Sequence, residues 1–478
     1  MELLFINIMI PKIIHQIWIG DETLAPINMM KTWQEKHPDF EYIFWNEKII
    51  QEKMSLTCLR EIEMMREING KADIIRWEIL YKFGGVFVDA DSICIEPIDD
   101  FFLEKKGFAT FENEILREGL IATGTMGFVP YHPLCRDIIE WIRGSEAHEK
   151  INRFRAWYSV GPGLLTDMLK SGKYKDFSVF PSYMFLPIHF TEQNMSGYMG
   201  HKKVYAYQEW GTANNNYETM NCELPKCLIE PKEWVSILIS SYNTNIEYIK
   251  ECLTSIQLQK GYFGMEIVWI NDGSNEENTI SLKQELEHFK KTSRWTKVQY
   301  KKFEKNQGTR ISLHFGILLC SNEIIFKMDS DDIMLPHRIQ TQLSYLRENP
   351  ECTICGSNMI LFTNDNNKKE KEYVSQTNHP TELLWEDFIK TPKEWFMNHS
   401  TLCYRKSCII KVGNYRIRSE NPSMMEDYEL EINFLREYGK IENIRENLLY
   451  YRIHTDQLTQ KNPSNSKEMI SLRENLDP

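Results

Sequence analysis

A short apolar strand leads into two aspartates in the first half of the chain: Gly84-Gly85-Val86-Phe87-Val88-Asp89-Ala90-Asp91. The preceding residues, from Ala72 to Phe83, have the spacing of an amphipathic helix, which the glycine pair would end. A helix that turns tightly into a strand is typical of an α/β sheet, and such sheets bind ligands at the carboxyl ends of their strands. Asp89 and Asp91 fall at that end, on the same side of the strand.

Two carboxylates on one side of a strand end favour a hard divalent cation, Mn²⁺ or Mg²⁺, which can bridge to phosphate oxygens. As a Lewis acid, the cation would stabilise the charge on a departing diphosphate. Asp73 and Arg76 are three residues apart, so they share one face of the predicted helix. An Asp-x-Asp alone is more often a solvated turn, but the helix, glycine pair and strand before it favour a binding site here.

Two strands in the second half also end in aspartates. Trp269 and Ile270 lead into Asn271-Asp272-Gly273-Ser274, and the strand that ends at Met328 leads into Asp329-Ser330-Asp331-Asp332. Because strand side chains alternate, Asp329 and Asp331 point to one side. A lone Asp-Gly-Ser is usually a turn, but the ordered series of strands and acidic ends is more specific.

The chain is predicted to divide near residue 230. A polar, proline-punctuated stretch reaches Pro231, and a fresh apolar strand begins at Val235. We therefore predict two domains, residues 1–228 and 229–478. Strands alternate with helices in both, which indicates a mostly parallel α/β sheet in each.

Composition limits the class of protein. The chain has 478 residues, with 56 Lys and Arg against 68 Asp and Glu, a net charge of −12. This balance argues against a binder of duplex nucleic acid, which needs a basic face, and 42% hydrophobic residues exclude general disorder. No run has the ~20 apolar residues of a transmembrane helix, and the opening residues lack the pattern of a signal peptide. We expect a soluble, cytoplasmic protein.

The first half resembles glycosyltransferase family 32, the sugar-binding family with an Asp-x-Asp motif. The resemblance rests on the opening Ile10–Gly20, Trp33–Trp45, Lys71–Trp77, Gly84–Asp91 and Gly161-Pro162-Gly163. It covers roughly residues 10–215 and implies a transfer that retains the anomeric configuration.

By this resemblance, Trp18 would stack on the nucleotide base, and Asp73 and Arg76 would hold the donor sugar at the catalytic centre. Asp89 would contact ribose or sugar and, with Asp91, the metal ion. The closing motif departs from the family. It reads Tyr207-Gln208-Glu209-Trp210 in place of a histidine-rich stretch, which leaves the last metal ligand open, with His201 close in sequence.

The second half resembles glycosyltransferase family 2, an inverting family built on the GT-A nucleotide-sugar transferase fold. Besides the two acidic strand ends, the resemblance rests on these motifs: Asn306-Gln307-Gly308, Asn398–Thr401, Val412–Tyr415, Met425–Leu430 and Tyr450-Tyr451-Arg452-Ile453-His454. One departure is His314, where the family often has Asn, and it leaves the contacts to the donor sugar open.

Carried over to this chain, Asp272 would bind uracil or ribose, Asp329 would lie near the ribose and Asp331 would ligate the metal. Asp427 would be the general base, although Glu426 beside it complicates the assignment. Inverting transfer is a direct displacement, so a carboxylate must take the proton of the acceptor hydroxyl on the face opposite the diphosphate.

Together the two halves predict a bifunctional glycosyltransferase with two GT-A-type domains in tandem, each using Mn²⁺ or Mg²⁺. UDP-sugars, or alternatively a GDP-sugar, would supply hexosyl or N-acetylhexosaminyl groups to a glycan or polysaccharide. Three alternatives stay open: one domain is catalytic and the other binds acceptor; Asp89 is the nucleophile of a phosphatase or phosphotransferase; or the chain is a lectin-like module.

Overall fold

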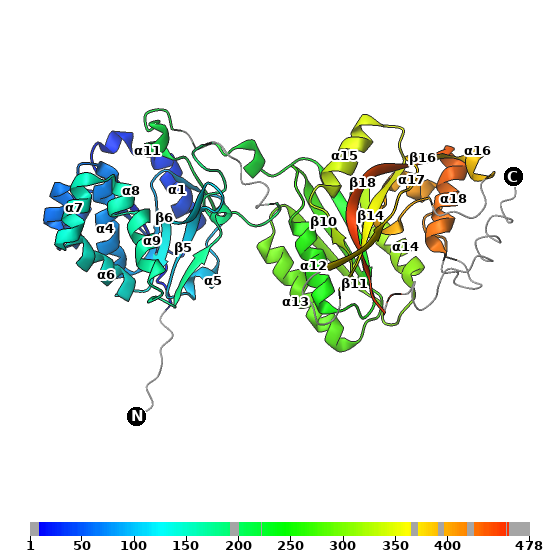
Figure 1. The fold of residues 1–478 in the computed structure, drawn as a ribbon, viewed down its shortest axis with the longest axis horizontal. Helices are drawn as coiled ribbons and strands as arrows, with labels where there is room; N and C mark the ends of the chain where they lie inside the picture. Colours follow the sequence, from blue (N-terminus) through cyan, green and yellow to red (C-terminus); the bar gives the residue numbers. More distant parts are fainter. Residues whose placement is uncertain are drawn as a thin grey trace, which may run out of the picture. The chain divides into compact units, whose positions relative to one another are not determined.

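The computed structural model describes residues 9–191, 200–220, 222–364, 371–390, 396–417, 425–455 and 457. The chain forms two compact units (Figure 1), one of residues 1–199 with 204–226 and the other of residues 200–203 with 227–478. The predicted domain boundary at 228/229 lies beside the last of these divisions and stays a prediction. Within the described residues, no helix combines the length and apolar character needed to cross a bilayer.

Unit 1 is built on a six-stranded mixed sheet in the order β2-β1-β3-β6-β5-β7. Its central strand β3 pairs in parallel with β1 and antiparallel with β6. The strands of this unit are β1 (Ile13–Ile17), β2 (Glu41–Trp45), β3 (Gly85–Val88), β5 (Gly107–Asn113), β6 (Arg117–Phe128) and β7 (Phe177–Phe180), with β4 (Ser92–Cys94) and β8 (Ala206–Gln208) forming a separate pair.

Helices cover both faces of this sheet and bury two apolar cores, one including α4 and α6 and the other including α1 and α5. They are α1 (Ile27–Lys36), α2 (Glu47–Lys53), α3 (Leu59–Met64), α4 (Ile68–Phe83), α5 (Asp100–Leu103), α6 (Pro133–Ile142), α7 (Ser145–Arg153), α8 (Ala156–Ser159), α9 (Pro162–Lys170) and α11 (Gly211–Asn214).

The glycine pair makes the predicted turn between α4 and β3. Gly84 and Gly85 have φ angles of +63° and +89°, values that favour glycine. A side chain at Gly85 would also place its Cβ 2.8 Å from Nε2 of His15 on the neighbouring strand β1. Only glycine therefore lets the chain turn here and delivers Asp89 to the end of the central strand.

Unit 2 has a larger mixed sheet of ten strands among the described residues, in the order β11-β10-β9-β12-β17-β14-β18-β13, with β15 beside β14 and β16 beside β18. The first four strands are parallel, but β12 pairs antiparallel with β17, so the sheet is less parallel than predicted. The strands are β9 (Trp234–Ser241), β10 (Gly264–Asn271), β11 (Thr296–Lys302), β12 (Ile324–Asp329), β13 (Ile333–Met334), β14 (Ile354–Asn364), β15 (Lys371–Gln376), β16 (Glu382–Leu384), β17 (Cys403–Arg405) and β18 (Lys440–Ile453).

The two faces of this sheet bury separate cores. Helices α12, α13 and α15 pack on one face, and α14, α17 and α18 pack on the other. The helices of unit 2 are α12 (Ile246–Gln257), α13 (Glu276–Thr292), α14 (Thr309–Leu319), α15 (Arg338–Glu348), α16 (Trp385–Phe388), α17 (Lys406–Lys411) and α18 (Glu426–Tyr438).

Candidate active sites

Arg76 joins the two acidic residues at the centre of unit 1. From α4, its Nη2 lies 3.2 Å from Oδ1 of Asp73 and 3.0 Å from Oδ1 of Asp89. Its Nη1 donates to the carbonyl of Thr123 on β6 at 2.5 Å. Asp73 and Arg76 are both buried. The guanidinium therefore fixes a helix carboxylate and a strand-end carboxylate in one arrangement.

Two glycines leave room for these carboxylates. A Cβ at Gly161 would lie 2.7 Å from Oδ2 of Asp73, and a Cβ at Gly124 would lie 2.7 Å from Oδ2 of Asp89. Burial raises the pKa of Asp73 to about 7, although the charge of Arg76 opposes this shift. The Gly-Pro turn noted in the sequence thus lies directly against Asp73.

Asp91 is held by the closing segment of unit 1. Nε2 of Gln208 donates to its Oδ1 at 2.5 Å, and the backbone N–H of Gly211 donates to its Oδ2 at 2.6 Å. The same Gln208 amide lies 3.4 Å from Oδ2 of Asp89, so one side chain reaches both carboxylates. Burial and the nearby charge of Asp89 raise the pKa of Asp91 to about 7.

The family resemblance did not predict a role for Gln208. The sequence signal that could have indicated one is the departure of its motif, residues 207–210, from the family pattern. His201, which lies close in sequence, is buried in unit 2 with its ring 4.8 Å from that of Phe263. The backbone N–H of His201 donates to Gln257, a residue of α12. Its ring therefore packs within unit 2.

Trp18 lies beside a second aromatic residue that the sequence did not suggest. Its Nε1 donates to the carbonyl of Asp21 at 2.8 Å, and its ring meets that of Tyr217 edge-on at 5.3 Å. Burial, and then the charge of Asp91, raise the pKa of Tyr217. The ring of Tyr217 therefore packs against the residue expected to stack on the nucleotide base.

In unit 2, Asp331 meets the closing motif of the chain. Its Oδ2 lies 2.9 Å from Nε2 of His454, just beyond β18. Both side chains are partly exposed. Asp329, at the end of β12, accepts a hydrogen bond of 2.5 Å from Nζ of the buried Lys327 on the same strand. Lys327 is a lysine within an otherwise apolar strand, and this is the sequence signal that could have indicated an ammonium group beside Asp329.

The buried Asp332 fixes the segment that carries His454. Its Oδ1 accepts from the backbone N–H of Arg452 at 2.9 Å, and Nε of Arg452 donates to the carbonyl of Asp331 at 2.7 Å. Arg452 also donates from Nη2 to Glu251 on α12. Asp332 therefore has a structural role: it holds the segment at Arg452 next to the two aspartates that were assigned from sequence.

Asp272 holds a loop of its own unit. Its two carboxylate oxygens accept from the backbone N–H groups of Gln307, at 2.7 Å, and Gly308, at 2.9 Å. Burial raises its pKa, and these two hydrogen bonds oppose the shift. The strand end and the Asn-Gln-Gly motif noted in the sequence are therefore in direct contact.

Asp427 stands at the start of α18 and is partly buried. Its Oδ1 accepts from the backbone N–H of Tyr428 at 2.8 Å. Burial, and then the charge of Glu426, raise the pKa of Asp427 to about 7. A carboxyl that titrates near neutral pH can accept a proton at working pH, as a general base must.

The acidic residues are of the right chemical type to bind a divalent cation, but few of them lie together. In the part of the chain that the structure describes, no group of three or more His, Cys, Asp or Glu is arranged to hold a metal ion. Asp331 and His454 lie in contact just after β12 and offer a carboxylate and an imidazole, and Asp89 and Asp91 offer two carboxylates after β3. Cys352 and Cys355 are buried and form no disulfide bond.

Comparison with known families gives two matches, one in each unit. Residues 26–108 match the model of the glycosyltransferase sugar-binding region containing the DXD motif. Residues 236–411 match the model of glycosyl transferase family 2. The first match includes Asp73, Arg76, Asp89 and Asp91.

Curated relatives are similar over about half of the chain. An uncharacterized glycosyltransferase of Haemophilus influenzae is 30% identical over 222 residues, which is 46% of this chain and 75% of the relative. The amylovoran biosynthesis glycosyltransferase AmsE of Erwinia amylovora is 28% identical over 230 residues, 47% of this chain and 79% of the relative. Among solved structures, S. aureus TarS 1-349 in complex with UDP-GlcNAc matches 50% of this chain and 64% of its own, at 16% identity and a TM-score of 0.36.

Proposed function

Because this chain belongs to the glycosyltransferases, with a DXD-containing sugar-binding region in unit 1 and a family 2 domain in unit 2, we propose that it is bifunctional. Each unit would carry its own site for transfer from a nucleotide-diphosphate sugar. The observation that carries the proposal is the presence of two separate acidic clusters, Asp73, Asp89 and Asp91 in one unit and Asp329 and Asp331 in the other, each at the end of a central strand.

A divalent cation, Mn²⁺ or Mg²⁺, would be held by Asp89 and Asp91 in unit 1. In unit 2, Asp331 would hold it together with His454 and with Asp329 nearby. The cation supplies Lewis acidity toward diphosphate oxygens when it is bound. The donor set supports this assignment, since carboxylates suit hard cations and imidazole also accepts Mn²⁺.

In unit 1, we assign the donor sugar to Asp73 and Arg76 and the nucleotide base to Trp18. The buried guanidinium of Arg76 keeps Asp73 and Asp89 in place, so the unit would bind its donor in a preorganised site. Among the described residues near Asp73, we identify no further carboxylate that is placed to act as a nucleophile. A transfer with retention would therefore depend on positioning and charge stabilisation.

In unit 2, Asp427 would remove the proton of the acceptor hydroxyl, and transfer would invert the anomeric configuration. The near-neutral pKa of Asp427 supports the role of base. Asp272 would contact the uracil or ribose through the loop that it holds, and Lys327 would keep Asp329 oriented near the ribose. Glu426 stands as the alternative base because it precedes Asp427 directly and burial raises its pKa as well.

The substrates follow from the same resemblance. UDP-sugars are the first choice of donor and a GDP-sugar the second, with a glycan or polysaccharide as acceptor. The relative that is named for amylovoran biosynthesis supports a polysaccharide acceptor. Two sites on one chain would raise the local concentration of the second site around the product of the first.

The test is donor consumption by three full-length proteins: wild type, Asp91→Ala and Asp331→Ala. Each would be incubated with Mn²⁺ and a panel of nucleotide sugars, with and without acceptor. Two active sites predict that each substitution abolishes use of one donor and spares the other. If one substitution leaves every transfer and hydrolysis unchanged, the corresponding unit is not catalytic and only binds acceptor.

A further inference from the structure

The outward side of α14 in unit 2 is apolar along its whole length. Phe315, Leu318 and Leu319 are 44%, 51% and 39% exposed, and the partly exposed Ile311 continues the same stripe one turn earlier. The buried side of this helix already packs in the core through Leu313 and Ile317. The helix is therefore apolar on both sides, and its outer stripe is largely exposed, with the ring of Phe315 next to that of Phe303.

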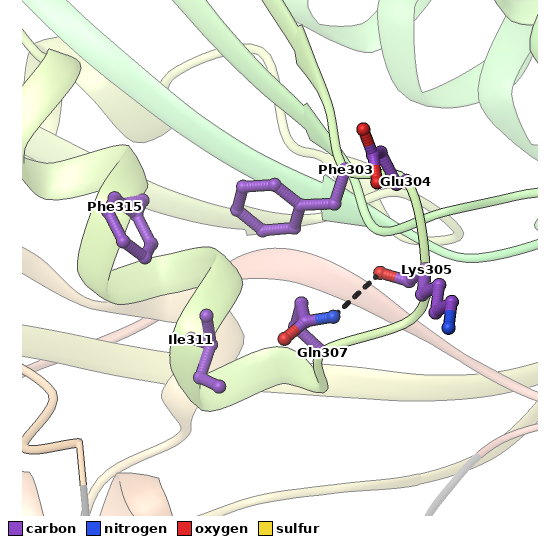
Figure 2. A pocket seen from close by; sticks show the side chains of 6 residues that line it. All are labelled: Phe303, Glu304, Lys305, Gln307, Ile311 and Phe315. Carbon is purple, nitrogen blue, oxygen red and sulfur yellow. Dashed lines mark hydrogen bonds between the residues drawn. The ribbon is translucent and has the colours of Figure 1, made fainter.

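A hollow of about 470 Å³ extends this stripe beside the strand end. Figure 2 shows Phe303, Ile311 and Phe315 on its walls, with Glu304, Lys305 and Gln307 along the loop that closes it. The rings of Phe303 and Phe315 are 5.8 Å apart. The stripe and hollow together make one apolar surface, which we term the α14 surface.

Lysines border the α14 surface along the edge strand β11. Gln299 faces α14, since its Nε2 lies 3.4 Å from the carbonyl of Leu319. Lys297 and Lys301 are two residues to either side, so they share that face, and both are exposed. The alternate residues face α13 instead, as shown by the ion pair of Lys302 with Glu276.

Positive charge is concentrated in this part of the sequence, although the chain as a whole is acidic. Residues 294–305 contain five Lys or Arg and one Glu, a balance of +4 within a protein of net charge −12. An apolar helix face beside lysines is the pattern of a helix that lies in a membrane interface, with the apolar side chains among the acyl chains and the ammonium groups at lipid phosphates.

We propose that the α14 surface docks unit 2 on the surface of an anionic lipid bilayer. The apolar stripe would enter the boundary between head groups and acyl chains, and Lys297, Lys301 and Lys305 would contact lipid phosphates. The proposal does not depend on which unit transfers sugar, because it concerns side chains outside both acidic centres.

The test is flotation of the full chain with vesicles of phosphatidylcholine alone or mixed with an equal part of phosphatidylglycerol. The wild type is expected to bind the anionic vesicles and to release them as salt rises. Lys301→Glu combined with Lys305→Glu should weaken binding by about tenfold or more. Phe315→Ser combined with Leu318→Ser should weaken it to a similar degree.

Matched controls come from α13, which covers the opposite face of β11. Ile280→Ser replaces a side chain that is 50% exposed, and Lys290→Glu reverses an exposed charge. Both should bind like the wild type, and thermal unfolding should show all variants folded. The proposal is overturned if the wild type ignores anionic vesicles, if the controls lose binding equally, or if sedimentation shows a dimer that Phe315→Ser and Leu318→Ser dissociate without any vesicle binding.

Discussion

Nε2 of His454 lies 2.9 Å from Oδ2 of Asp331, although 123 residues separate them along the chain. The contact joins the Tyr-Tyr-Arg-Ile-His motif at residues 450–454 to the acidic end of β12. It exists because Asp332 and Asp331 bind the backbone and side chain of Arg452, two residues before the histidine. Because of this contact, substitution of His454 tests metal binding in unit 2 directly.

His454→Ala should weaken Mn²⁺ binding to unit 2 by at least about tenfold, since even loss of a residue that only supports a ligand commonly costs that much. Titration calorimetry on the Asp91→Ala background isolates this site. His288→Ala, an exposed histidine on α13, is the control and should leave the affinity unchanged. Equal affinity in the His454 variant would remove this histidine from the metal site.

Asp427→Asn should reduce kcat of the unit 2 reaction by about 10²–10⁴-fold, the usual contribution of a general base. A base must be deprotonated to act. With the pKa of Asp427 at about 7, the wild-type rate should therefore rise with pH through about 7 and then level off. The measurement is the pH profile of kcat/KM.

Glu426→Gln provides the companion measurement for Asp427. The charge of Glu426 raises the pKa of Asp427, so its removal should shift the rising limb of the pH profile to lower pH. If the pH profile of the Glu426→Gln variant is not shifted, or if Asp427→Asn keeps the shape of the wild-type profile, then another residue is the base.

Gly161→Ala should impair donor use in unit 1. An alanine at this position would place its Cβ 2.7 Å from Oδ2 of Asp73. Displacement of that carboxylate by about 1 Å should lower kcat/KM by up to about 10²-fold, the usual effect of misplacing a group that positions the substrate. The reaction of unit 2, measured on the same sample, serves as the internal control. A loss in both reactions would indicate misfolding instead.

Glu431→Leu should stabilise the protein at high pH. Glu431 is buried one turn after Asp427 on α18, and its carboxyl interacts with the backbone of Phe396. Burial, and then the charge of Asp427, raise its pKa well above the ordinary value. Ionising it therefore costs free energy in the folded state only, so wild-type stability falls as pH rises above the unfolded pKa of about 4.3.

The leucine variant lacks this penalty. Its free energy of unfolding should exceed that of the wild type by about 1–3 kcal/mol at pH 8, with a smaller difference at pH 5. Urea unfolding at both pH values measures the effect. Glu437→Leu, near the exposed end of the same helix, should show no comparable pH-dependent gain. A variant that is less stable than the wild type at pH 8 would contradict the prediction.

The fold class was predictable because its signals are local. The predicted arrangement of two GT-A-type α/β domains is confirmed by the two mixed sheets and the two family matches. The helix before the glycine pair was predicted to begin at Ala72 but begins at Ile68. Gly70 disfavours a helix on its own, yet a side chain there would collide with Met65 and Ala156, so close packing explains the glycine.

Amino-acid sequence alone determined which strands end in carboxylates, because alternation, turn glycines and helix spacing act over a few residues. Tertiary structure decided which distant groups meet them: Gln208 at Asp91 and His454 at Asp331. Both pairs join residues more than a hundred positions apart. They depend on strand order and on packing between elements, which no local pattern encodes. The placement of His201 in unit 2 has the same cause, since its backbone pairs with α12 and not with its neighbours in sequence.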